Sequence, residues 1–230
     1  MCPSDTWPPD VRHLPTQDEL PCDDGVPMET ARHRQQMNLL IQTLQPWLAT
    51  RGDGFVGGNM FVYFSPQQLR GEDFKGPDCF VALGVPPGER KSWVVWEEGK
   101  PPDLVIELLS PATAGYDKSD KLRLYQDRMQ VPEYYWYDPF QSADWAGFQR
   151  LSGRYRPIAP DARGNLPSPL LGLSLTRWRG CYEGVEAVWL RWMTPEGRLL
   201  PTGEERAEAA EAELQRLRAL LARRDGDRNP

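Results

Sequence analysis

Residues 101–111 read PPDLVIELLSP, and the other expected elements are placed relative to this short segment. Aliphatic residues stand on both sides of a single glutamate, Glu107, and prolines bound the run at each end. A short apolar run between turn residues is typical of a strand that is buried on both faces. An ionised carboxylate buried there without a partner would cost on the order of several kcal/mol. Glu107 therefore needs a metal ion, a cation or a proton.

The residues that follow this strand supply a candidate cation. They are expected to form a helix, and Asp117, Lys121 and Tyr125 are spaced four apart, so they share one helix face. Upstream, Asp78 comes immediately before a second apolar run. Two acids on apolar strands and a lysine on the next helix are residue types that a metal-dependent phosphodiesterase uses.

Composition limits the function classes. The 230 residues are enough for one domain with an appendage, and 40% hydrophobic with 26% charged residues is ordinary for a soluble globular protein. The net charge of −6 argues against broad, sequence-blind adhesion to nucleic acid. A nucleic-acid enzyme would therefore need a local basic rim and a metal. The four scattered cysteines form no CxxC pair, and two histidines exclude a histidine-rich metal site.

The N-terminal residues are polar and rich in proline, unlike a signal peptide. The sequence has no apolar run that approaches the roughly 18 residues needed to cross a bilayer. We therefore expect a cytoplasmic protein without membrane contact.

The order of the expected elements favours an α/β fold with a mixed central sheet flanked by helices. The Glu107 strand, the helix from residue 117 and an aromatic strand at 131–137 suggest a right-handed crossover between parallel strands. Residues 145–200 are expected to be antiparallel, with a hairpin turn at Ser152-Gly153. The expected boundaries are a disordered arm over 1–20, one domain over 21–200, an amphipathic helix over 201–224 and a tail over 225–230.

The expected C-terminal helix has a heptad pattern. Its small and apolar residues recur at intervals of three and four, at Ala207, Ala210, Leu214, Leu217 and Leu221. Glutamates cluster early and arginines late, which is the order that the helix dipole favours. Three interpretations stay open: a coiled coil that forms a homodimer, packing on the chain's own body, and a helix exposed to solvent.

The two strand acids suit Mg²⁺, with Mn²⁺ as a possible substitute. Mg²⁺ is held by one or two carboxylates together with a carbonyl and waters. Asp78 and Glu107 supply the carboxylates, and the backbone carbonyl of Leu108 is a candidate third ligand. Lys121 would stabilise the scissile phosphate or orient the attacking water. The alternative is that the acids pair with Lys121 or Arg123 and hold no metal.

Glu29 and His33 lie four residues apart at the start of an expected helix, for which Thr30 is a plausible N-cap. Glu29 is either an acid placed favourably at a helix N-terminus or a third carboxylate of the site. His33 is expected to be a surface or capping residue. Tyr125 is either a core residue or, with Asp117, an accessory residue of the site.

Taken in chain order, these residues resemble a known family. The motif residues are Pro77-Asp78, Glu107 followed by Leu-Ser-Pro, Asp117 with Lys121, Leu124-Tyr125, Val131-Pro132-Glu133-Tyr134 and Asp138-Pro139. The set is similar to the Uma-two family of restriction-endonuclease-like proteins, within the PD-(D/E)XK nuclease superfamily. The similarity is clearest from Asp78 to Pro139.

The resemblance implies a restriction-endonuclease-like core and Mg²⁺-dependent cleavage of nucleic acid, with DNA as the expected substrate. It implies that Asp78 is the first acid of the motif and Glu107 the second. The superfamily lysine would stand at position 109, where this chain has Leu109, and Lys121 would replace it from the following helix. The rival hypothesis is a non-catalytic module that keeps the fold and binds itself or a partner through its C-terminal helix.

Overall fold

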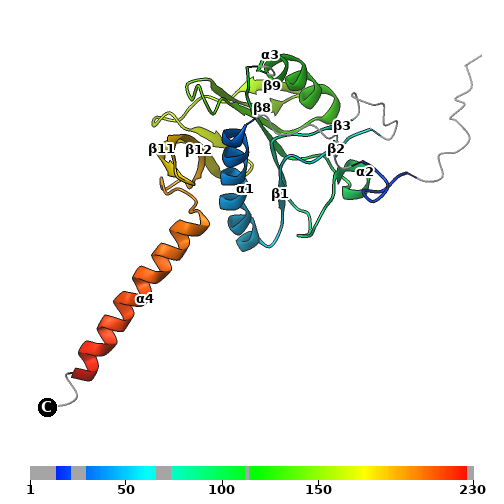
Figure 1. Cartoon of the computed structure of the whole chain (residues 1–230). Coiled ribbons are helices and arrows are strands. Elements are labelled where there is room, and N and C mark those ends of the chain that lie inside the picture. Colours follow the sequence, from blue (N-terminus) through cyan, green and yellow to red (C-terminus); the bar gives the residue numbers. More distant parts are fainter. Residues whose placement is uncertain (1–13, 22–29, 66–73, 112–113, 227–230) are drawn as a thin grey trace, which may run out of the picture.

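The central element is a six-stranded mixed sheet (Figure 1). The structure is a computed structural model and describes residues 14–21, 30–65, 74–111 and 114–226. In spatial order the strands are β1 (Phe55–Gly57), β4 (Cys79–Ala82), β6 (Leu104–Leu108), β7 (Glu133–Tyr137), β8 (Trp145–Leu151) and β9 (Arg154–Pro157). β6 and β7 are parallel, and the other neighbours are antiparallel. The expected parallel pair and the expected hairpin at Ser152-Gly153 are both confirmed.

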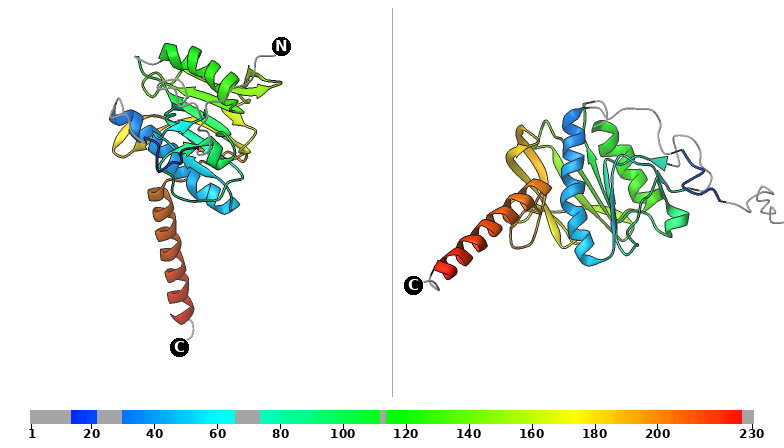
Figure 2. Two further views of the ribbon diagram at one scale, coloured as in Figure 1. Left: turned by 90° about the vertical axis from the view of Figure 1, so that its right-hand side faces the viewer. Right: turned by 60° about the horizontal axis from the view of Figure 1, so that its bottom comes forward.

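One face of this sheet is covered by a long helix and a second sheet. The helix is α1 (Ala31–Arg51), and the sheet contains β10 (Leu166–Ser168), β11 (Leu173–Tyr182) and β12 (Val185–Met193). Leu104, Ile106 and Leu108 of β6 point to this side and join its apolar core. Figure 2 shows α1 lying between the central sheet and the solvent.

The opposite face is covered by the crossover between β6 and β7. It is a helical segment made of α3 (Ala114–Tyr116), η1 (Asp117–Lys121) and η2 (Leu124–Met129). A small third sheet lies on the same side, with β3 (Phe74–Lys75), β2 (Val62–Tyr63), β5 (Trp93–Val94) and the one-turn helix α2 (Val95–Glu98). The crossover helix begins at Ala114, before the expected start, and contains π-helical turns, which are common at functional sites.

The segment 14–21 differs from the expected disordered arm. Its polar groups have partners on the third sheet and α2: Trp96 Nε1 donates to the Pro15 carbonyl, and Tyr63 Oη donates to the Pro21 carbonyl. The Gln17 amide also donates to Glu97. These bonds hold the segment against the domain, and the domain boundary expected at residue 20 stays a prediction.

The C-terminal helix is α4 (Gly203–Gly226), close to the expected 201–224. Its start is a reciprocal capping box: the Glu205 amide donates to Thr202 Oγ1, and the Thr202 amide donates to Glu205 Oε2. Beyond this first turn, α4 projects away from the body in every view (Figures 1 and 2). Within the described residues, none of the helices combines the length and apolarity that a bilayer crossing requires.

Candidate active site

The two acids predicted from the sequence face each other across neighbouring strands. The antiparallel register pairs Cys79 with Ile106 and Phe80 with Val105, so one step further Asp78 lies opposite Glu107. Because side chains alternate along a strand, both acids lie on the side of the sheet that the crossover helix covers. The Leu108 amide donates to Asp78 Oδ2 at 2.7 Å. Glu107 is close enough for its negative charge to act on Asp78.

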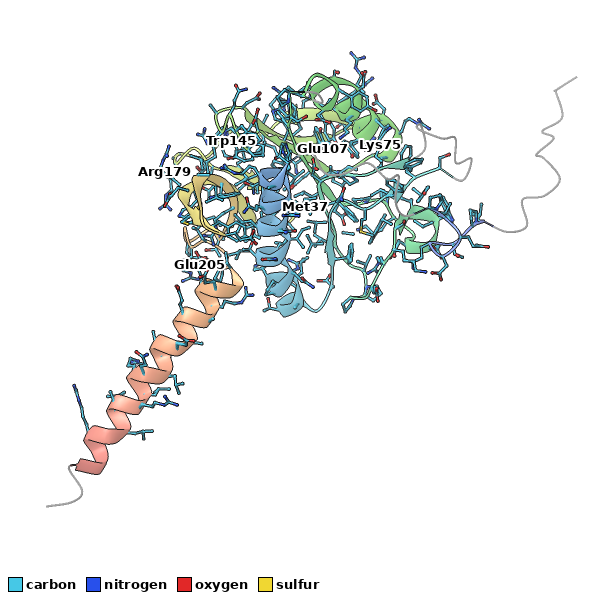
Figure 3. The ribbon with its side chains drawn as sticks, in the orientation of Figure 1. Met37, Lys75, Glu107, Trp145, Arg179 and Glu205 are labelled. Carbon is cyan, nitrogen blue, oxygen red and sulfur yellow. The ribbon has the colours of Figure 1, made fainter. Side chains whose placement is uncertain are left out.

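The crossover helix brings the predicted lysine onto these acids. Lys121 Nζ lies 3.0 Å from Glu107 Oε2 and 2.8 Å from Asp117 Oδ1. Tyr125 Oη donates to the other Glu107 oxygen, Oε1, at 2.7 Å. The helix face that carries Asp117, Lys121 and Tyr125 therefore lies over β6. Figure 3 shows Glu107 inside the body, below the crossover helix.

Burial shapes the charge of this cluster. Desolvation raises the pKa of Asp78 well above its ordinary range, and the negative charge of Glu107 raises it further, against the opposing effect of the Leu108 amide. Burial alone would lower the pKa of Lys121, but the carboxylates of Glu107 and Asp117 more than reverse this and raise it. Lys121 is therefore a firmly protonated ammonium at neutral pH. With three carboxylates facing one ammonium, full ionisation leaves two negative charges uncompensated.

A divalent ion fits this donor set. Among the residues that the structure describes, no group of three or more His, Cys, Asp or Glu side chains is arranged to hold a metal. Mg²⁺ does not require such a cage, because it binds through one or two carboxylates and keeps several waters. The raised pKa of Asp78 indicates two acids that repel each other in a buried space, and a cation would relieve that repulsion.

The Leu108 carbonyl is the candidate third ligand. The amide and carbonyl of one residue in a strand point to the same edge. The Leu108 amide points to Asp78, so its carbonyl faces the same edge. β4 begins at Cys79, and its register with β6 ends at Ile106, so no residue of β4 is paired with Leu108. The residues that could hold a divalent ion are therefore Asp78, Glu107 and Leu108.

Tyr134 contacts the site but was not predicted from the sequence. Its hydroxyl donates to the Asp117 carbonyl at 2.9 Å, and its ring lies 5.2 Å from that of Tyr125. Side chains alternate along a strand, so Tyr134 lies with Trp136 on the face of the crossover helix. The available sequence signal was the motif Val131-Pro132-Glu133-Tyr134, which marks the residue but not its partner.

The N-terminal turn of α1 lies near the same end of β6. Thr30 is the N-cap, as predicted, and accepts from the His33 amide. His33 was expected to be a surface or capping residue; at 3% exposed it is not on the surface, but it does contact the N-cap Thr30. Its Nε2 lies 3.0 Å from the Leu109 carbonyl and its Nδ1 2.8 Å from Thr30 Oγ1. The predicted accessory acid Glu29 lies outside the described residues, and Arg123 is exposed rather than paired with the acids.

Two cations contact aromatic residues that adjoin elements of the site. The Lys75 amine lies 5.9 Å from the ring of Tyr116, the residue before Asp117. The Arg32 guanidinium lies 5.7 Å from the ring of Phe140, and Phe140 in turn lies 5.8 Å from His33. Phe140 is 59% exposed. Local positive charge therefore exists near this end of the sheet despite the acidic balance of the whole chain.

The mixed sheet, the crossover helix and the acid–lysine cluster define a protein of restriction-endonuclease-like fold. Residues 15–178 match the model of the Uma2 family, described as "Putative restriction endonuclease". The chain belongs to this family, which confirms the resemblance seen in its motif residues. No curated protein matches the chain.

One solved structure that is similar to the chain is described as "a putative nuclease belonging to DUF820" from Anabaena variabilis. The two share 18% sequence identity with a TM-score of 0.46, over 68% of this chain and 90% of the other.

Proposed function

We propose that this protein is a divalent-metal-dependent endonuclease that hydrolyses phosphodiester bonds of nucleic acid, with DNA as the substrate. Asp78, Glu107 and the Leu108 carbonyl would hold Mg²⁺, or Mn²⁺ in its place. The observation that carries the proposal is the convergence of two strand carboxylates with the Lys121 ammonium 3.0 Å from one of them.

The chain's own residues have separate roles in this proposal. A bound Mg²⁺ would neutralise charge that develops on the phosphate and would lower the pKa of a water. Lys121 is the catalytic donor: its raised pKa keeps it protonated, so it donates to a phosphate oxygen or to the attacking water and does not act as a base. Asp117 and Tyr125 are positioning residues, because they fix Lys121 and Glu107.

The proposed compartment is the cytoplasm. Disulfides form mainly in oxidising compartments. Of the described cysteines, Cys79 and Cys181 are free thiols, which agrees with the proposal.

A second candidate function is a nuclease fold that acts without catalysis, through protein contacts of its C-terminal helix. The observation that favours it is the row of exposed leucines on α4. We propose a homodimer through α4 for the endonuclease as well, so the two candidate functions differ in their chemistry and share this interaction.

The test is plasmid cleavage at low salt, with Mg²⁺ or Mn²⁺ and with chelator, for the wild type and for Glu107→Gln. Glu186→Gln, an exposed residue of β12, is the matched control. The proposal expects metal-dependent cleavage that Glu107→Gln loses and Glu186→Gln keeps. If folded wild-type protein neither cuts nor binds metal in calorimetry, the non-catalytic module becomes the better account.

A further inference from the structure

α4 leaves its apolar residues without cover. From 206 to 221 every side chain of the helix is exposed. The leucines are between 46% and 57% exposed, namely Leu214, Leu217, Leu220 and Leu221. A helix that makes no tertiary packing is only marginally stable in water. We infer that a second copy of this chain covers α4, and that the two helices run antiparallel.

Side-chain size favours this orientation. The heptad seam begins with Ala207 and Ala210, and it ends with Leu217 and Leu221. In an antiparallel pair centred on Leu214, Ala207 of one copy meets Leu221 of the other, and Ala210 meets Leu217. The layers on either side of the central Leu214 pair then each combine a small and a large residue, so bulk is distributed evenly about the centre. A parallel pair would place alanine on alanine at one end and leucine on leucine at the other, which packs unevenly.

Charge favours the same orientation. The first half of α4 is acidic, with Glu204, Glu208 and Glu211, and the second half is basic, with Arg216, Arg218 and Arg223. An antiparallel pair lays the acidic half of each helix along the basic half of the other. Beside the seam, Glu211 would face Arg218 of the second copy.

Glu213 is the seam-flanking acid that would meet its own copy. Arg216 of the same helix already binds it through both Nε and an Nη, each at 2.8 Å. This local ion pair reduces the repulsion between the two copies of Glu213. Opposed helix dipoles add to the preference for the antiparallel arrangement.

The base of α4 is anchored to the body, so a helix pair would fix the two bodies relative to each other. Arg191 is 1% exposed and binds both oxygens of Glu205, at 2.8 and 2.6 Å. It also donates to the Leu200 carbonyl. Figure 3 shows Glu205 at the junction of body and helix. At about 1.5 Å per residue, a helix of 24 residues is ~36 Å long, so the two bodies would lie at opposite ends of a short rod.

Such a pair has twofold symmetry, with its axis next to Leu214. This inference rests on the proposed homodimer and does not depend on catalysis. The dimer would present two copies of the candidate site, one at each end of the rod.

The first experiment is sedimentation velocity of the full chain. The wild type should sediment as a dimer, and Leu217→Glu should sediment as a monomer at the same concentration. The matched control is Gln215→Glu, which adds the same charge two residues away and off the seam, and it should remain dimeric. Both positions are exposed, so the body should keep its near-UV circular dichroism. A monomeric wild type, or a dimer that Leu217→Glu leaves intact, would overturn the inference.

The second experiment determines the orientation. In full-length protein with Cys2, Cys22 and Cys181 replaced by serine, Ala207→Cys and Leu221→Cys are made separately and oxidised alone or mixed. The antiparallel pair predicts a disulfide-linked dimer only in the mixture. Cross-linking of each variant with itself would show a parallel pair, and a dimer without any cross-link would refute the register. Neither readout depends on cleavage, so a missing dimer and a missing nuclease activity are separate results.

Discussion

Replacement of Lys121 by methionine removes the cation from a buried cluster of acids. The Lys121 ammonium contacts Glu107 and Asp117, whose side chains are 1% and 2% exposed, while its own is 17% exposed. Removal of one partner from a buried ion pair costs about 3–5 kcal/mol, because the other charge stays buried without compensation. We expect Lys121→Met to lower the free energy of unfolding by about that amount at pH 7 in the absence of metal.

The matched control is Lys118→Met, on the same helical segment. Lys118 pairs with Asp144, and both side chains are about one third exposed, at 34% and 37%. Solvent screens such a pair, so its loss should cost at most about 1 kcal/mol. The two variants make the same chemical change, and they differ in the burial of the pair.

The assay is urea unfolding followed by tryptophan fluorescence in chelator, repeated over pH. The folded-state pKa of Lys121 is raised above its ordinary 10.5, so the stabilisation is fully present below that value and is lost as pH rises through the folded pKa. The gap between wild type and Lys121→Met should therefore close in strong alkali. It should also narrow on addition of Mg²⁺, which replaces the missing positive charge. A loss no larger than that of Lys118→Met would show that Lys121 does not compensate buried charge.

Three further predictions concern the site and the helix anchor. Asp78→Asn should stabilise the metal-free protein at neutral pH and abolish Mg²⁺ binding, as scanning calorimetry and Mg²⁺ titration would measure. The folded-state pKa of Asp78 is raised above its ordinary 3.8, so the stability that protonated Asp78 contributes is fully present below pH 3.8 and is lost as pH rises through the folded-state pKa. Tyr125→Phe should lower the free energy of unfolding by about 2 kcal/mol, because it removes a hydrogen bond to a buried carboxylate, and an unchanged urea midpoint would contradict this. Glu205→Ala should lower the melting temperature, because it leaves the buried Arg191 without its carboxylate, and an unaltered melting curve would show that the pair contributes nothing.

The local parts of the site could be predicted from the sequence. A glutamate inside an apolar run requires compensation whatever the rest of the fold does, and this requirement pointed to Glu107. The four-residue spacing of Asp117, Lys121 and Tyr125 follows from helix geometry and holds even though the helix contains π-helical turns. The parallel pairing of β6 and β7 follows from the strand–helix–strand order.

The long-range parts could not be predicted in the same way. Asp78 faces Glu107 because β4 lies beside β6 in one register, and neither the neighbour nor the register is encoded by local spacing. His33 is buried because its ring reaches the carbonyl of Leu109, 76 residues away. The helix-start pattern in the sequence indicates that residues 30–33 cap the helix. It does not indicate the contact with Leu109, because that contact depends on how α1 packs against β6.

Anomalous diffraction from crystals grown with Mn²⁺ would show whether Asp78 and Glu107 hold a metal ion. We expect a manganese peak between the carboxylates of Asp78 and Glu107, within coordination distance of the Leu108 carbonyl and with the Lys121 ammonium beside it. Crystals that diffract well and show no peak there, with Lys121 still bound to Glu107 and Asp117, would contradict it. In that case the lysine alone would compensate the buried acids, and the site would be structural.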